Sequence, residues 1–257
     1  MSSSSVEYSV PIENAGQVGV LVSSALSILI PTLLVTLRFI AKRSVARSLD
    51  ASDYCIVVAL IFNIGLHIDC WPMVYRGAFG FHVADIMVRF GLETLTFFFK
   101  GIMCFALIWN GTICFSKLSV LLMYSALIPI RHLIIPARVL GTLIVLWNFS
   151  SFVAGLAMCQ PIARNWDQSI RGGFCGDKVK YYMWLGIINV VTDVLILALP
   201  IPFVYGLNMK LRKRLVLIAM FSIGFFTCAI TIYRQTMLTY LDFTDMPFSG
   251  LLATIFS

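Results

Sequence analysis

Six long apolar stretches dominate this sequence and constrain what it can fold into. A helix needs about 20 predominantly apolar residues to cross the hydrocarbon core of a bilayer. The stretches run over residues 18–41, 53–74, 103–128, 135–159, 181–207 and 215–240. Only 12% of the 257 residues are charged, about half the share found in soluble domains. The sequence therefore predicts an all-α, multi-pass transmembrane helical bundle, and it excludes a soluble enzyme, a secreted disulfide scaffold and a disordered chain.

Two segments do not fit a simple span. Residues 94–128 are apolar apart from Lys100 and Lys117, and they are too long for one untilted crossing. We therefore expect a helical extension above the membrane. Residues 247–257 form a seventh apolar stretch of eleven residues at the end of the sequence, so we expect six complete spans and a truncated seventh. No repeat, linker or low-complexity region divides the chain, which predicts a single transmembrane domain over residues 1–257.

Basic residues between the spans predict the orientation of the chain. Cytoplasmic loops of membrane proteins carry an excess of Lys and Arg. Nine of them lie in the connections after spans one, three and five, counting Arg138 at the start of span four. The opposite side holds six, not counting Lys100 of the expected helical extension, and the N-terminal tail holds none. We expect the N-terminus on the non-cytoplasmic side of a plasma membrane or endomembrane. This placement explains the net charge of +7 by topology, so we expect the lipid bilayer and no nucleic acid as partner.

Several amide and ionisable side chains fall inside the predicted spans, where such groups usually face protein or a watery cavity. At about 1.5 Å of rise per residue, Lys117 lies about 21 Å and Asp193 about 18 Å below the outer boundary. Opposite charges at one depth favour an ion pair. Other members lie nearer the outer surface, so we expect a polar seam that opens outward. The seam comprises Asn110, Lys117, Asn189, Asp193 and Arg234.

The role of the Lys117–Asp193 pair has two interpretations. Polar side chains commonly join helices in membranes, so the pair can be a packing clamp; alternatively, it belongs to a ligand-binding or catalytic site. Asp193 and His67 are the candidate acid or base groups, although an ion-paired Asp193 would be a poor general acid. His67 has no second His or Cys at ligand spacing, so we expect no metal. Arg38 and Asp53 flank the first basic loop and are expected to form a structural pair at the membrane surface.

The cysteines predict one disulfide. Most of the seven lie within spans, where a small apolar thiol needs no further role. Cys159 and Cys175 flank the outer loop between spans four and five, which faces an oxidising compartment in the expected orientation. We expect a disulfide at Cys175, with Cys159 as the first candidate partner and Cys104 or Cys70 as the alternatives.

A series of short motifs runs along most of the chain. They are Arg38, Asp53-Tyr54, Gly80-Phe81-His82, Lys117-Leu118-Ser119, Cys159-x-Pro161 with Trp166 and Cys175, Asn189 with Asp193, Pro200 and Pro202, and Gly224 with Arg234. In order and spacing they resemble the fungal rhodopsin-like seven-helix membrane proteins. That group includes receptor-like proteins of filamentous fungi and the membrane proteins named after the satratoxin biosynthesis cluster. This chain departs from the pattern at Ala78, where the family has Gly, and in lacking the usual Arg shortly after Ser119 and the acidic residue of span seven.

The resemblance to rhodopsin-like proteins does not imply retinal. Opsins bind retinal through a Lys in the last helix, whereas no Lys follows Lys213. The sequence also lacks the Asp-Arg-Tyr and Asn-Pro-x-x-Tyr motifs of conventional G-protein-coupled receptors. We therefore expect neither a cofactor nor light sensing.

Three functions are compatible with these features. The resemblance implies an accessory membrane protein of a fungal secondary-metabolite (mycotoxin-type) pathway, whose strongest form is a membrane-embedded cyclase or isomerase. The second is a receptor-like sensor, in which Trp109, Trp166 and the polar seam would line a pocket for an apolar small molecule. The third is a transporter, although the inverted repeats and broken helices of many transporters are not visible. Whether the chain is an enzyme stays open.

Overall fold

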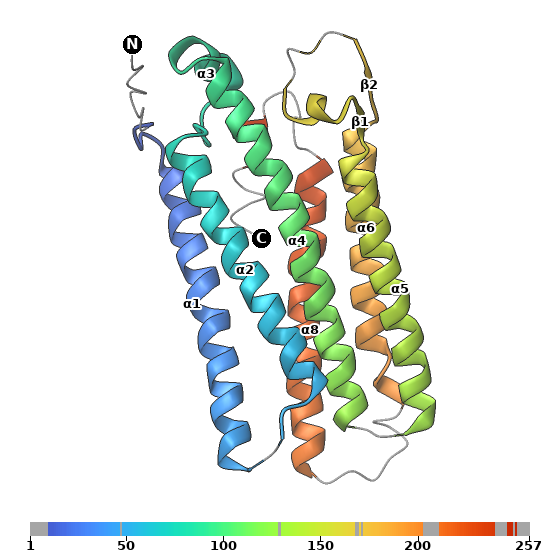
Figure 1. The fold of residues 1–257 in the computed structure, drawn as a ribbon. Helices are drawn as coiled ribbons and strands as arrows, with labels where there is room; N and C mark the ends of the chain where they lie inside the picture. The colour runs from blue at the N-terminus through green and yellow to red at the C-terminus, as the bar shows by residue number, and fades with distance from the viewer. Residues whose placement is uncertain are drawn as a thin grey trace.

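The computed structural model describes residues 10–46, 48–127, 130–167, 170, 172–202, 211–239, 246–248 and 250. The long helices of this described part lie side by side in one bundle (Figure 1). They are α1 (Ala15–Ser44), α2 (Ala51–Tyr75), α4 (Leu92–Leu127), α5 (Arg131–Leu156), α6 (Lys178–Ala198) and α8 (Leu211–Thr239). The coarse prediction of an all-α, multi-pass helical bundle is confirmed.

Shorter elements gather at one end of the bundle (Figure 1). They are α3 (Val83–Arg89), the 3-10 helix η1 (Ile162–Asn165) and the antiparallel strands β1 (Cys159–Gln160) and β2 (Phe174–Cys175). We call this the hairpin end. The C-terminal ends of α1 and α4 lie toward the opposite end (Figure 1). Sequence patterns of period 3.6 or 2 need longer segments than these to be recognised, and none of the short elements was predicted.

Five described helices are long and apolar enough to cross a membrane, namely α1, α2, α4, α5 and α6. Each coincides with one of the first five predicted spans. The expected extension of the third span is the beginning of α4, a continuous helix of 36 residues that starts at Leu92. The sixth predicted span coincides with α8, whose described apolar segment is the shorter Phe221–Tyr233. Of the predicted seventh stretch, residues 247, 248 and 250 are described and the rest lies outside the described part.

The surface of the bundle is apolar where a soluble protein would be polar. On α1, Leu29, Leu33 and Leu37 recur every fourth residue, and their exposed fractions are 65%, 60% and 52%. Gln17 and Ser24 of the same helix are buried instead. A helix that exposes its apolar face and buries its polar side chains is suited to a lipid solvent, in which backbone hydrogen bonds are satisfied inside the helix.

Close helix approach depends on small residues of α4. A Cβ atom added at Gly111 would lie 3.3 Å from the ring of Phe62 on α2, and one added at Gly101 would lie 2.7 Å from Cγ of Met73. Small residues at such positions allow backbones to approach, which is how helices commonly associate in membranes. One turn from Gly111, the Phe62 and Phe115 rings stack with centroids 5.7 Å apart. These contacts fix α2 against α4.

The predicted disulfide is present between Cys159 and Cys175. The two residues are directly opposite each other in the β1–β2 pair, so the bond closes the hairpin over the segment that contains η1. The alternative partners Cys70 and Cys104 are free. Asn165 of η1 donates a hydrogen bond to the carbonyl of Leu156 at 3.2 Å, which ties the loop to the end of α5.

Candidate functional site

A cavity of about 360 Å³ lies between α2, α4, α5, α6 and α8 in the half of the bundle nearer the hairpin end. Its walls are mainly apolar and aromatic, with Phe99 and Phe105 on α4 and Phe152 on α5. Along α4 the lining runs from Phe99 to Asn110, which corresponds to about 16 Å of helix at 1.5 Å per residue. Small-molecule sites are typically apolar cavities of about 300–1,000 Å³ with a few polar groups. This cavity has the size and character of such a site.

Two asparagines of the predicted seam line the inner part of this cavity, Asn110 on α4 and Asn189 on α6. The Asn110 amide donates a hydrogen bond to the carbonyl of Asn148 on α5 at 3.0 Å. A second cavity of about 20 Å³ shares Asn110 and Asn189 and reaches Lys117, and its volume is enough for one water molecule. Polar side chains therefore lie at the inner end of the larger, mainly apolar cavity.

Lys117 of α4 binds three groups of α6. Its Nζ lies 3.0 Å from Oδ1 of Asp193, 2.8 Å from the carbonyl oxygen of Asn189 and 2.5 Å from Oγ1 of Thr192. The ion pair predicted from the depth of the two charges is present. An ammonium has three N–H donors, and the three acceptors match them. Because the Lys117 side chain is only 9% exposed, this geometry favours a clamp between α4 and α6 over a free cation that awaits a ligand.

The other residues singled out from the sequence are placed differently. His67 is buried but is not among the described residues that line either cavity, and its Nδ1 has no hydrogen-bond partner in the described part of the structure. Trp109 lines both cavities, whereas Trp166 lines neither of them among the described residues. Arg234 belongs to α8, but its side chain lies outside the described part. The structure thus brings together Asn110, Lys117, Asn189 and Asp193.

Sequence reasoning missed several residues of the cavity wall. Gln235 of α8 lines it and donates a hydrogen bond to the carbonyl of Met183 on α6 at 3.3 Å. A Cβ at Gly186 would lie 1.6 Å from Oε1 of Gln235, so this glycine lets the Gln235 side chain lie against α6. Tyr181 closes another side by donating to the carbonyl of Ser151 on α5 at 2.6 Å. The sequence feature that could have identified Gln235 as a lining residue is its polar side chain near the end of a predicted span.

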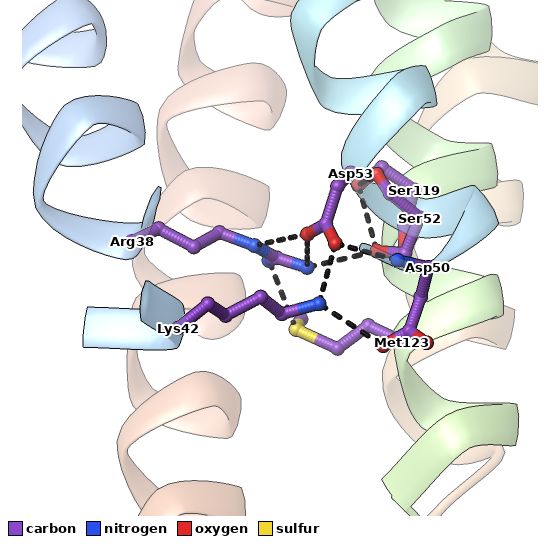
Figure 2. A network of polar contacts seen from close by, with 7 residues as sticks. All are labelled: Arg38, Lys42, Asp50, Ser52, Asp53, Ser119 and Met123. Atoms are coloured by element: carbon purple, nitrogen blue, oxygen red, sulfur yellow. Dashed lines mark hydrogen bonds and ion pairs between the residues drawn. The ribbon is translucent and has the colours of Figure 1, made fainter. Parts of the chain in front are cut away.

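A second polar cluster joins α1, α2 and α4 at the end opposite the hairpin (Figure 2). We call it the Asp53 cluster; it comprises Arg38, Lys42, Asp50, Ser52, Asp53, Ser119 and Met123. The Asp53 carboxylate accepts hydrogen bonds from Nε of Arg38 at 3.1 Å and from Nζ of Lys42 at 2.5 Å. Its side chain is 2% exposed. The expected Arg38–Asp53 pair is present, and the sequence did not reveal that Lys42 joins it.

The Asp53 cluster continues to α4 through two serines. Nη2 of Arg38 donates to Oγ of Ser52 at 3.0 Å, and Ser52 donates to the carbonyl of Ser119 at 3.0 Å. Oγ of Ser119 donates in return to the carbonyl of Ser52 at 2.9 Å. Polar groups in a membrane protein need partners within the protein, and these reciprocal bonds supply them. The cluster joins three helices, and its residues line neither of the two cavities described above.

The apolar helices, their lipid-suited surface and their internal polar clusters define a multi-pass helical membrane protein. Within that class, the family model of the fungal rhodopsin domain matches residues 37–257. The chain belongs to this family.

Two curated proteins illustrate the relationship. The chain is 31% identical over 193 residues to the "Polyenoic acids biosynthesis gene cluster protein Ba17b" of Metarhizium anisopliae, an alignment that covers 74% of this chain and 52% of that protein. It is 32% identical over 96 residues to a "SAT4 family membrane protein" of Emericella nidulans, covering 36% and 25% of the two chains. The alignments thus span about half the length of the first relative and a quarter of the second. No solved structure matches it.

Proposed function

We propose that this chain binds an apolar small molecule within the membrane and serves as an accessory component of a fungal secondary-metabolite pathway. The observation that carries the proposal is the cavity of about 360 Å³, with its aromatic walls and the amides of Asn110 and Asn189 at its inner part. The family membership and the relative named for a polyenoic acid biosynthesis cluster support the pathway.

The two residues considered as acid or base, Asp193 and His67, support ligand binding better than they support catalysis. Asp193 is held by Lys117 at 3.0 Å, and an ionised carboxylate has no proton to donate. His67 is not among the described lining residues of the cavity. A cyclase or isomerase would need a positioned acid or base within reach of its substrate. A receptor-like sensor is the second candidate because it would use the same cavity, and a transporter is the third.

The proposal includes an architecture. We propose that α8 is the sixth span, that residues 1–257 form one domain and that the N-terminus is on the non-cytoplasmic side. The apolar segment Phe221–Tyr233 of α8 supports the sixth crossing. The disulfide Cys159–Cys175 supports the orientation, because disulfides persist in oxidising compartments and this one lies at the hairpin end, where α1 begins.

The test compares two tryptophan variants in the fungus that carries the gene. Ala106 of α4 lines the cavity, whereas Cys104 of the same helix is exposed on the outside of the bundle. Ala106→Trp fills the cavity, and Cys104→Trp places the same ring in lipid. Each variant replaces the gene, and metabolites are profiled by mass spectrometry at matched protein levels, with the deletion strain alongside.

We expect the Ala106→Trp strain to show the metabolite defect of the deletion strain and the Cys104→Trp strain to resemble wild type. An Ala106→Trp strain with a full wild-type profile contradicts the proposed function. An unchanged profile in the deletion strain, accompanied by an altered transcriptional response to added metabolites, would favour the sensor instead.

A further inference from the structure

The cavity has a single charged side chain among its described lining residues, Lys178. Lys178 is the first residue of α6, and it lies at the hairpin end of the cavity, eleven residues or about 16 Å along the helix from Asn189. It is half-buried, and no hydrogen bond or ion pair joins its side chain to another group in the described part of the structure. A partly buried ammonium beside an apolar chamber is unfavourable unless an anion accompanies it.

The nearest acidic residue in sequence is already occupied. Asp177, the N-cap of α6, accepts a hydrogen bond from the Lys180 backbone N–H at 3.2 Å, and its other oxygen lies 3.2 Å from Nζ of Lys180. Both of these side chains are on the surface, 48% and 74% exposed. Lys180 therefore neutralises Asp177 in the solvent, and Lys178 lines the cavity with no counter-ion among the described residues.

We propose that the cavity binds a single-chain amphiphilic carboxylic acid, whose carboxylate pairs with Lys178 and whose apolar chain extends between the aromatic walls toward Asn110 and Asn189. This inference rests on the proposed binding function and names its ligand class. Lys178 lies at one end of the cavity and the other described lining residues are uncharged, which sets the direction of the ligand.

The chemistry of the site selects a carboxylate over a phosphate and one chain over two. A single Lys is a point charge that suits a monoanion, whereas planar Arg forks or several cations suit phosphate groups. The cavity of about 360 Å³ is near the lower limit for small-molecule sites. A lining about 16 Å long accommodates one extended apolar chain. The body of the ligand would contact Phe99, Phe105 and Phe152.

The test measures binding of radiolabelled hexadecanoic acid and hexadecan-1-ol to the purified full chain in detergent at pH 8, by scintillation proximity. The two probes share an apolar chain and differ in the charge of the headgroup. The variants are Lys178→Met and, as a matched control, Lys180→Met, which removes the same charge from the exposed surface two residues away. Lys178→Gln is a second variant in case Lys178→Met does not fold, and size-exclusion profiles verify all of them.

We expect wild type to bind the acid more tightly than the alcohol. Lys178→Met should weaken acid binding by about tenfold or more, the usual effect of removing a hydrogen-bonded charge. The alcohol should bind equally to both proteins, and Lys180→Met should leave the acid affinity unchanged. Lys178→Arg, which keeps the charge, should retain the preference for the acid.

Several results overturn the inference. Equal wild-type affinity for acid and alcohol, or equal losses in Lys178→Met and Lys180→Met, removes the role of Lys178 while leaving cavity binding intact. Displacement of hexadecanoic acid by a lower concentration of lysophosphatidic acid identifies a phosphate amphiphile instead. Binding of neither probe overturns the acid assignment, and if metabolites are also unaffected by Ala106→Trp, the proposed function fails with it.

Discussion

Replacing Asp53 by Asn tests the energetics of the polar cluster at the end opposite the hairpin. The substitution keeps the shape of the side chain and removes its charge, so the two cations that it binds lose their common partner. The Arg38 and Lys42 side chains are 27% and 16% exposed. Removing one partner of a buried ion pair costs about 3–5 kcal/mol. Because both cations keep some access to solvent and Lys42 retains Asp50 at 3.0 Å, we expect the lower figure, about 3 kcal/mol.

The assay is thermal survival of the purified protein in detergent, followed by fluorescence-detected size exclusion. A domain of this size loses about 2–4 °C of Tm per kcal/mol, so Asp53→Asn should lower Tm by about 6–12 °C. Asp50→Asn is the control. Its side chain is 36% exposed and, among the described cations, pairs with Lys42, and Asn is as good an N-cap for α2 as Asp. An exposed pair contributes at most about 1 kcal/mol, so the control should lose less than about 4 °C.

Equal losses of Tm in Asp53→Asn and Asp50→Asn would refute this reasoning, because burial would then have no effect on how much a carboxylate charge contributes to stability. An unchanged Tm in Asp53→Asn would refute it as well. The double variant Arg38→Gln/Asp53→Asn adds a second check. It should lose less than the sum of the two single variants, since removing both members avoids leaving a charge unpaired.

Two further predictions concern the Lys117–Asp193 ion pair and the Cys159–Cys175 disulfide. Lys117→Met should lower the free energy of unfolding by about 3 kcal/mol because Asp193 loses its counter-charge. Adding Asp193→Asn should restore part of this loss in the same thermal assay. Strictly additive losses in the double variant would exclude the clamp. Cys175→Ser opens a loop whose ends are 16 residues apart, which should cost about 3 kcal/mol, with the free cysteine variant Cys104→Ser as the control. Peptide mapping under non-reducing conditions verifies the disulfide, and equal Tm in both cysteine variants would show that it does not contribute to stability.

The parts of the fold that the sequence predicted are those that the bilayer itself imposes. Apolar length follows from hydrocarbon thickness, so each described span coincides with an apolar stretch. The Lys117–Asp193 contact was predictable because helical rise converts residue number into depth, and opposite charges at one depth in a membrane have little alternative to pairing. The same reasoning located the Arg38–Asp53 pair from two charges that flank a short connection.

The parts that the sequence did not predict depend on helix rotation and packing. His67 was a candidate acid or base because it lies within a predicted span, but the rotation of α2 keeps it out of the cavity wall in the described structure. Lys178 was counted from the sequence among the basic residues of an outer loop. A residue at the boundary of a span can face either solvent or the bundle, and the sequence pattern does not distinguish the two orientations. Ser52 and Ser119 carry too small a polarity signal to be noticed alone, yet they exchange reciprocal hydrogen bonds.

The two halves of α4 have different surroundings. One half is held to neighbouring helices by the Lys117 contacts and the Asp53 cluster, and the other half lines the cavity. Lys117 and Ser119 are two residues apart, so they project from nearly opposite sides of the helix, and each binds a different neighbour: Lys117 contacts α6 and Ser119 contacts α2. Polar contacts inside a membrane are costly to break because no water replaces them. The stretch from Phe99 to Asn110, toward the hairpin end, lines the cavity instead. A ligand that enlarges the cavity would therefore separate the helices at the hairpin end while the clusters hold the opposite half fixed.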